Sequence, residues 1–167
     1  MPGALAVYRE FQRRLAAGEV AALGDVVDLE GYTENCLGLT GWTTGFGVAL
    51  ANFGKNMLAP FADRRTTEEE VVECGDVVVI RGRIEATHTG EFLGVAPTGR
   101  RVAWDYLVIA HVEDGRLVGQ CVQPDLWGLH QQLTVAAPEP PARTKADASR
   151  TTASAATQDC SSCCERK

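Results

Sequence analysis

The sequence predicts an α+β fold in which a curved antiparallel sheet packs on N-terminal helices. Two observations carry this prediction. Apolar residues recur at helical spacing up to residue 61, and β-branched residues then dominate strand-like segments up to residue 124. Helices followed by a run of strands, rather than alternating with them, are typical of the α+β class.

The first segments are expected to be helical. Residues 5–17 place apolar side chains at helical spacing, and Gly18 supplies a stop. A second short helix is expected over residues 19–26. After an irregular segment, residues 42–61 predict a longer helix, because their large apolar side chains lie close to one stripe.

That stripe has two interpretations. Phe46, Phe53 and Met57 lie close to it, and such a stripe usually packs in a core. The alternative is that these side chains line a ligand pocket, with Tyr32 of the irregular segment at its mouth. Both interpretations stay open at this point.

The next part predicts a hairpin of residues 66–73 and 77–88. In its second strand one face is apolar, with Gly82 between larger residues, which leaves space above the sheet. Residues 89–99 contain three Gly and one Pro and predict a loop. His88 before the loop and Phe92 within it are expected near the pocket, although His88 could instead satisfy the backbone of its own loop.

Residues 101–133 predict two strands, a tight turn and a short closing helix. A two-residue turn at Asp114 and Gly115 would place His111 and Asp125 on opposite faces. A bulged turn with Gly115 in the left-handed conformation would place them on one face. We favour the bulged turn, because Glu-Asp-Gly supplies suitable residues in the right order.

A His and an Asp on one apolar sheet face are candidate acid/base groups. His111 and Asp125 are therefore the predicted catalytic pair, and Asp105 is a second candidate carboxylate on that face. Leu107 and Cys121 share the face, and Trp127 is expected to close the pocket floor. In the alternative interpretation, His111 is a surface residue and Asp125 caps the closing helix.

Charge and hydropathy restrict the partners. The net charge of −6 and the pI of about 5.1 argue against a general nucleic-acid binder. No apolar run approaches the roughly 18 residues that cross a bilayer, and no signal peptide is visible at the N-terminus. We therefore expect a cytoplasmic protein with no membrane partner.

Composition changes at residue 134. Residues 134–167 contain no Leu, Ile, Phe, Tyr or Trp, which predicts a disordered tail behind a folded domain of residues 1–133. Three cysteines crowd its end: Cys160, Cys163 and Cys164. Because no His lies near them, we predict a flexible thiol-bearing tail and no metal site.

Residues 88–101, H-T-G-E-F-L-G-V-A-P-T-G-R-R, resemble the SnoaL-like polyketide cyclases, also called ester cyclases, of the nuclear-transport-factor-2-like superfamily. The later segments H-V-E-D-G-R-L-V and P-D-L-W-G-L-H-Q-Q-L fit the same family. The resemblance covers residues 5–133. It implies a cone-shaped fold, with a strongly curved antiparallel sheet wrapped over helices around an apolar pocket.

The resemblance also implies a reaction. Founding members close a ring of an aromatic polyketide by intramolecular aldol chemistry, without a metal or organic cofactor. Their His and Asp from the last two strands match His111 and Asp125. Two departures remove bulk: Gly119-Gln120-Cys121 stands where relatives often carry Glu-His-Trp, and Gly82 where many carry Trp. They imply a different or larger ligand.

The expected function is a cofactor-free cyclase or isomerase that acts on a small hydrophobic polyketide-like or terpenoid substrate. A non-catalytic binding module is the alternative from another class. Epoxide hydrolysis or hydration is a third possibility, and it would normally require an Asp-Arg-Asp cluster. Arg81 and Arg83 count against it, because they lie on the strand face opposite the apolar pocket row. We also expect a homodimer, formed through a second apolar row: Val102, Trp104, Tyr106, Val108, Ala110 and Val112.

Overall fold

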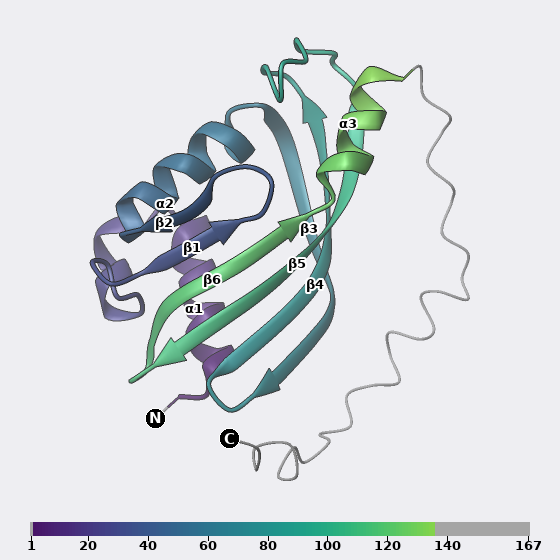
Figure 1. Ribbon diagram of the computed structural model, residues 1–167. Helices are drawn as coiled ribbons and strands as arrows, with labels where there is room; N and C mark the ends of the chain where they lie inside the picture. Colours follow the sequence, from purple (N-terminus) through teal and green to yellow (C-terminus); the bar gives the residue numbers. More distant parts are fainter. Residues whose placement is uncertain (1, 136–167) are drawn as a thin grey trace. The chain divides into compact units, whose positions relative to one another are not determined.

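The computed structural model describes residues 2–135 and confirms the α+β class (Figure 1). Residues 136–167 of the predicted tail, with its terminal cysteines, lie outside the described residues, whereas Thr134 is the last residue of the closing helix. The elements follow in this order: α1 (Ala4–Ala16), the 3-10 helix η1 (Val20–Asp25), β1 (Thr33–Cys36), β2 (Gly41–Thr44), α2 (Phe46–Phe53), the π-helical turn η2 (Gly54–Leu58), β3 (Phe61–Cys74), β4 (Val77–His88), β5 (Arg101–Glu113), β6 (Arg116–Pro124) and α3 (Leu126–Thr134).

The strands form one curved six-stranded sheet in the order β2-β1-β6-β5-β4-β3. Neighbouring strands are antiparallel except β1 and β6, which are parallel. Two sequence predictions were wrong here. The segment expected to be irregular contains β1, and the helix expected over residues 42–61 begins only at Phe46, because its first residues pair with β1 as β2.

Helix α1 packs on the concave, inner face of the sheet (Figure 1). Its buried residues Ala4, Val7, Tyr8 and Phe11 recur at helical spacing, as the sequence predicted. Gly18 ends the helix with a φ of 72°, in the left-handed region that glycine adopts without strain.

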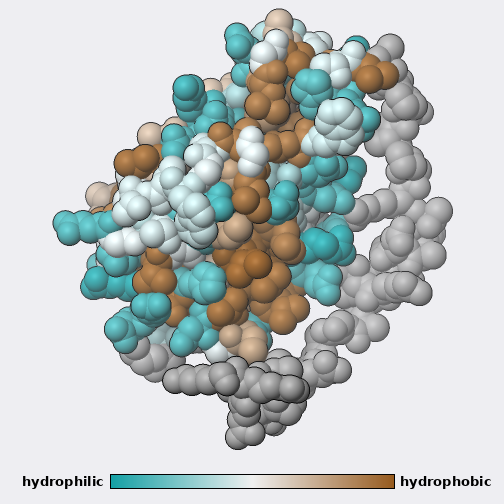
Figure 2. Space-filling view, viewed as in Figure 1, coloured by the Kyte–Doolittle hydropathy of each residue, from teal (hydrophilic) through white to brown (hydrophobic). Residues whose placement is uncertain are grey.

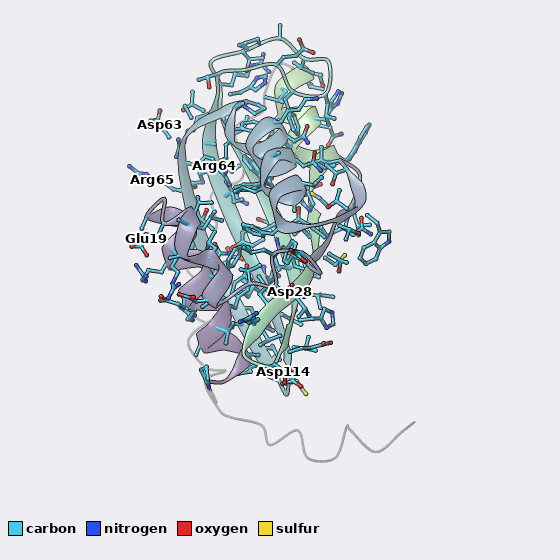
Figure 3. All side chains as sticks on the ribbon, turned by 90° about the vertical axis from the view of Figure 1, so that its left-hand side faces the viewer. Glu19, Asp28, Asp63, Arg64, Arg65 and Asp114 are labelled. Atoms are coloured by element: carbon cyan, nitrogen blue, oxygen red, sulfur yellow. The ribbon has the colours of Figure 1, made fainter. Side chains whose placement is uncertain are left out.

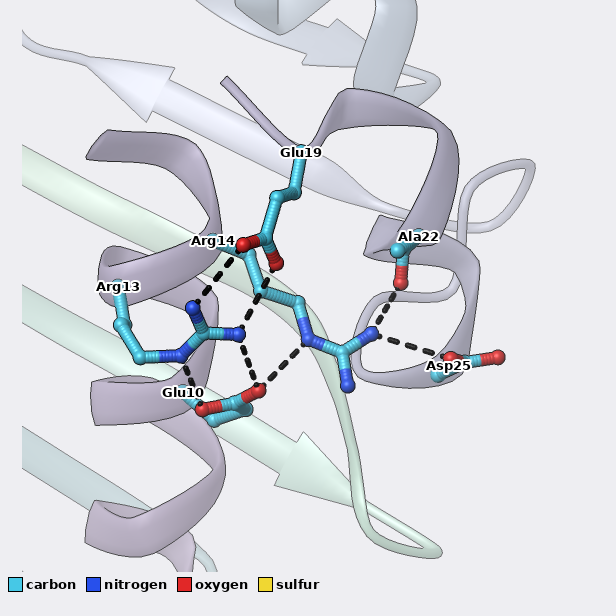
Figure 4. A network of polar contacts seen from close by, with 6 residues as sticks. All are labelled: Glu10, Arg13, Arg14, Glu19, Ala22 and Asp25. Atoms are coloured by element: carbon cyan, nitrogen blue, oxygen red, sulfur yellow. Dashed lines mark hydrogen bonds and ion pairs between the residues drawn. The ribbon is translucent and has the colours of Figure 1, made fainter. Parts of the chain in front are cut away.

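An ion-pair network fixes the chain after α1 (Figure 4). Glu10 accepts from Arg13 and Arg14, and these hydrogen bonds lower the pKa of Glu10 to about 2. Arg14 also binds the Ala22 carbonyl oxygen and, at 3.0 Å, the Asp25 carboxylate. The network therefore joins α1 to η1 and directs the chain back toward β1.

The even-numbered and the odd-numbered side chains of β5 point to opposite faces of the sheet. Even-numbered residues from Val102 to Val112 point to the inner face, whereas Arg101, Leu107, His111 and Glu113 are exposed on the outer face. The row proposed above as a dimer interface is therefore the inner wall, and that prediction was wrong. Its uniformly apolar side chains are buried by α1 and the other elements of the inner face.

The turn between β5 and β6 is also not the one expected. Asp114 and Gly115 both have positive φ, 48° and 75°, and Glu113 pairs with Arg116, as in a two-residue turn. A bulge between the pairs Val112–Leu117 and His111–Gly119 gives β6 one extra residue and brings His111 opposite Gly119. His111 and Asp125 consequently share a face as predicted, but through another bulge, and that face is the outer one.

The interior contains two apolar clusters. One joins α1, η1 and Phe46 to the sheet around Val108. The other surrounds Trp104, which is 1% exposed, and includes residues of α3. Tyr106 packs against both clusters.

Gly82 does not leave empty space for a larger ligand, contrary to the interpretation of its missing side chain. A Cβ atom at this position would lie 2.6 Å from Tyr106 Oη and 2.6 Å from the Thr67 carbonyl oxygen. Tyr106 therefore occupies the space above Gly82. The described residues contain no helix long and apolar enough to cross a bilayer.

Candidate functional site

A cavity of about 210 Å³ lies between the two apolar clusters on the inner face. Its apolar wall includes Phe53, Met57, Ile84, Trp104 and Val108. Its polar and ionisable lining consists of Tyr8, Gln12, Glu34, Cys36, Thr40, Asn52, Asn56, Arg64, Thr66, Glu68, Tyr106 and Gln120. The lining is thus mixed, and it carries more polar and ionisable groups than the mostly apolar lining that is usual for small-molecule sites.

Glu34 is the buried carboxylate of this cavity, with an exposed fraction of 9%. It projects from β1, and its partner in the register of β6 is Gln120. Its Oε2 accepts a hydrogen bond of 2.8 Å from Gln120 Nε2 and one of 3.1 Å from the Tyr32 hydroxyl. The parallel β1–β6 pair therefore places a carboxyl group and its donor side by side.

Burial raises the pKa of Glu34 above its ordinary value, and the hydrogen bonds from Gln120 and Tyr32 oppose this shift. Removal of water disfavours the ionised form of a carboxyl group. Such a group can be protonated and deprotonated closer to neutral pH than an exposed glutamate. This property suits a side chain that transfers a proton in each turnover.

Burial keeps the thiol and the phenol groups of the cavity neutral. Burial raises the pKa of the Cys36 thiol to about 11, so this cysteine is a poor nucleophile. Burial also raises the pKa of Tyr8 and Tyr106. Within residues 2–135, no three His, Cys, Asp or Glu side chains gather where they could hold a metal ion.

Arg64 reaches the cavity because β3 is bulged. Residues 63 and 64 both lie opposite Ala86 of β4, between the pairs Ala62–Thr87 and Arg65–Glu85. Asp63 adopts a positive φ of 51°, which accommodates the extra residue of the bulge. Figure 3 shows the result: Arg64 lies on the inner side of β3, while Asp63 and Arg65 point away from the molecule.

The Arg64 guanidinium is largely desolvated, and this burial lowers its pKa. Its carbon Cζ lies 5.2 Å from the centre of the Phe53 ring. Nη1 donates to the Met57 carbonyl oxygen at 3.2 Å, whereas Nε is buried and has no acceptor among the described residues.

The predicted pair His111 and Asp125 is not in this cavity. Both are exposed on the outer face. His111 lies opposite Gly119, six residues before Asp125, so the two are about 20 Å apart along the strand. Asp125 Oδ1 accepts from the Gly128 amide at 2.9 Å and caps α3, which is the alternative role considered above. A catalytic role for the pair stays a prediction that this geometry does not support.

Several other predicted residues line an open outer groove of about 560 Å³ together with Asp125: Asp105, Leu107 and Trp127. Asp105 pairs with Arg83 at 2.9 Å. Trp127 is 70% exposed and stacks on His130, so it does not close a pocket floor. Cys121 lies opposite Ile109 of the outer row.

The predicted residues of the helical stripe divide into two groups. Phe53 and Met57 line the inner cavity. Phe46 instead packs in the core, with its ring centre 5.3 Å from that of Tyr32. Tyr32 is fully buried rather than at a pocket mouth, and it contacts the site through its hydroxyl.

His88 and Phe92 serve the loop and the core. His88 Nδ1 accepts from the Thr98 amide at 3.2 Å and lies 3.1 Å from the Thr98 hydroxyl, so it holds its own loop. Burial lowers the pKa of His88. Phe92 packs on Phe61, with ring centres 4.9 Å apart. Neither residue lines the cavity, contrary to the expectation.

Substitutions of Asp125 test whether this residue is catalytic or only caps α3. We expect Asp125→Asn to leave turnover nearly unchanged, because the carboxylate faces away from the cavity. Asp125→Ala should lower the free energy of unfolding by about 1 kcal/mol, because it removes the helix cap. Turnover assays and chemical denaturation of both variants check this expectation. A loss of about 100-fold in Asp125→Asn would return the catalytic role to the outer groove.

The fold and the cavity define a class of small α+β proteins with a chamber between sheet and helices. The model of the SnoaL-like polyketide cyclase family matches residues 6–133, and the chain belongs to this family. The motif of residues 88–101 had indicated the same family.

One relative is named for its reaction. The aklanonic acid methyl ester cyclase AcmA of Streptomyces galilaeus is 32% identical over 77 residues, which are 46% of this chain. The match spans about half of that relative, 54% of its length.

Solved structures show the same fold. IdmH of Streptomyces antibioticus, described provisionally as a polyketide cyclase, is 25% identical with a TM-score of 0.65, over 79% of this chain and 99% of IdmH. A protein of Acidithiobacillus ferrooxidans with the same provisional description is 23% identical with a TM-score of 0.67, over 80% of this chain and 96% of that one.

Proposed function

We propose that this protein is a cofactor-free cyclase that closes a ring of a polyketide-like substrate in the inner cavity, with Glu34 as the proton-transferring group. The observation that carries the proposal is the buried Glu34 carboxyl, which lines the cavity and is held by Tyr32 and Gln120. The family and the name of AcmA supply the reaction class.

One carboxyl group can carry out both proton transfers of an aldol ring closure. Ionised Glu34 takes a proton from a carbon activated by a neighbouring carbonyl, and the resulting enolate carbon attacks a second carbonyl of the same molecule. A carbon–carbon bond forms, the carbonyl π bond breaks, and its oxygen becomes an alkoxide. Protonated Glu34 returns the proton to this alkoxide, so that protons balance over the turnover.

The neighbours of Glu34 position it. Tyr32 and Gln120 both bind Oε2, which leaves Oε1 available to the substrate. Gln120 Oε1 is itself buried without a donor among the described residues, and a substrate hydroxyl group can supply one. The cavity of about 210 Å³ lies below the usual range of about 300–1,000 Å³ for drug-sized ligands, which favours a compact substrate.

The test uses aklanonic acid methyl ester, the substrate in the name of AcmA, and a smaller aryl β-keto ester. Product formation is measured for the first compound, and deuterium incorporation at the carbon between the two carbonyl groups for the second. The proposal requires that the protein accelerate at least one of these reactions. Binding of aromatic compounds without acceleration of either would favour the binding-module alternative.

Epoxide hydration receives less support from the cavity. Arg64 is the arginine of the lining, but no ion pair joins it to a carboxylate within residues 2–135. Glu68, the second carboxylate of the cavity, pairs with Arg9 at 3.0 Å. The joined acid–arginine–acid arrangement expected for that reaction is therefore not formed.

A homodimer remains part of the proposal, with the outer face as its contact in place of the inner row. Figure 2 shows an apolar band over the middle of this face. The apolar side chains on the outer face of β4 and β5 include Leu107, which is 37% exposed, and the partly exposed Val79 and Ile109. We expect the mass of a dimer in sedimentation at micromolar concentration and a shift toward monomer in Leu107→Glu. A monomeric wild type would contradict this assembly.

A further inference from the structure

Arg64 is a cation that has no anionic partner within residues 2–135. The charged groups that line the cavity are Glu34, Arg64 and Glu68. Glu68 is paired with Arg9, and Glu34 with Tyr32 and Gln120. Arg64 has a carbonyl oxygen and an aromatic face as neighbours, but no carboxylate among the ion pairs of the described residues.

Burial of such a group costs free energy of folding. A buried guanidinium Nε without an acceptor is a strong donor left unsatisfied. The bulge at Asp63 turns this side chain inward, whereas Arg65 next to it points to solvent. The Asp63 carbonyl oxygen is bound by Arg101 at 2.9 Å, which holds the bulge.

A second donor without an acceptor lies on the same inner face. Trp104 Nε1 is buried and has no acceptor within residues 2–135. Trp104 pairs with Ile84, one inward-facing position along β4 from Ala86, which lies opposite Arg64. Arg64 and Trp104 therefore each present a buried donor without an acceptor on this side of the cavity. The carboxyl group of Glu34 lies on β1, next to the edge strand β2 on the opposite side of the sheet from β3.

We propose that Arg64 binds an ionised carboxylate of the substrate, so that the cavity takes compact aromatic or polyketide-derived carboxylic acids in preference to their neutral esters. The carboxylate accepts from the guanidinium and lies near Trp104, which directs the rest of the molecule toward Glu34. The inference rests on the proposed function only in using the same cavity. It gives this chain a substrate preference opposite to the methyl ester in the name of AcmA.

The test is a binding measurement that needs no turnover. Naphthoate and methyl naphthoate share one ring system and differ in charge at neutral pH. Their dissociation constants are measured by calorimetry and by quenching of tryptophan fluorescence. We compare wild type with Arg64→Met, which removes the charge at similar length, with Arg64→Lys, which retains a charge, and with Arg65→Met, which makes the same change on the exposed neighbour.

We expect the wild type and Arg65→Met to bind the acid at least about tenfold more tightly than the ester, the usual scale of a charge-assisted hydrogen bond. Arg64→Met should lose this preference through weaker binding of the acid, and Arg64→Lys should keep part of it. Equal binding of acid and ester by the wild type, binding of neither, or a preserved preference in Arg64→Met would overturn the assignment. If Arg64→Met does not fold, the wild-type preference and Arg64→Lys decide.

This outcome is separable from that of the proposed function. Full activity in Glu34→Gln would contradict the catalytic proposal and leave the acid preference of the wild type as it is. Loss of the acid preference would leave catalysis by Glu34 standing.

Discussion

Glu34→Gln is expected to fold normally and to lose about 100-fold or more in turnover, the scale of a general acid/base group. Glutamine has nearly the same shape and still offers Tyr32 and Gln120 an oxygen acceptor, but it cannot accept the substrate proton. The free energy of unfolding should change little, because the substitution removes a carboxyl group whose burial disfavours its charge. The measurement is kcat together with a denaturation curve.

Glu30→Gln is the matched control, since it makes the same change on an exposed residue. Tyr32→Phe removes one hydrogen bond to Glu34 and should give a smaller loss than Glu34→Gln, together with a changed pH profile. If Glu34→Gln turned over substrate at the wild-type rate, the acid/base role of Glu34 would be lost.

Trp104→Ala is expected to lower the free energy of unfolding by about 3–5 kcal/mol. Trp104 is 1% exposed and packs on Phe61, with ring centres 5.0 Å apart, so the substitution opens a void within the core. Since small domains are stable by about 5–15 kcal/mol, much of the total is lost. The measurement is equilibrium denaturation at fixed pH.

Leu107→Ala provides the comparison on the same strand. Leu107 points to the outer face and is 37% exposed, so its replacement should cost about 1 kcal/mol or less in a monomer. If Trp104→Ala lowered the free energy of unfolding as little as Leu107→Ala, Trp104 would lie on an exposed face. The sequence-based prediction of a dimer interface along this row implied such an exposed position.

The class of fold could be predicted from the sequence because helical periodicity in the N-terminal part is followed by the long strands β3 to β6, and because the motif of residues 88–101 is distinctive. Helix α1 and strand β4 were predicted within one residue at each end, since their apolar periodicities are regular. The short strands β1 and β2 were missed. Each has four residues. Strand β1 depends on pairing with the distant β6, and β2 depends on pairing with β1, so local propensity alone does not indicate them.

The face of β5 was predicted wrongly although the sequence held a usable signal. Its even-numbered row is wholly apolar, whereas the odd-numbered row includes Arg101, Asp105 and His111. The more uniformly apolar row is the better candidate for the buried face. A prediction based on the apolar row, and not on the pair His111 and Asp125, places Tyr106 and Gln120 on the cavity side.

Glu34 and Arg64 had no comparable signal. Glu34 becomes part of the site through the parallel pairing of β1 with β6, which joins residues that are 86 positions apart. Arg64 faces inward because of a bulge, and a bulge shifts the alternation of strand residues by one position. Both facts depend on tertiary structure.

The central claim is that a buried glutamate on the inner face carries the proton. Its most direct test is titration of the Glu34 side-chain carboxyl carbon by carbon-13 NMR, assigned by comparison with Glu34→Gln. We predict a midpoint above the ordinary glutamate value of about 4.3, at the pH where kcat/KM rises as the base becomes ionised. A midpoint at or below the ordinary value, or an unchanged rise of kcat/KM in Glu34→Gln, would contradict the claim.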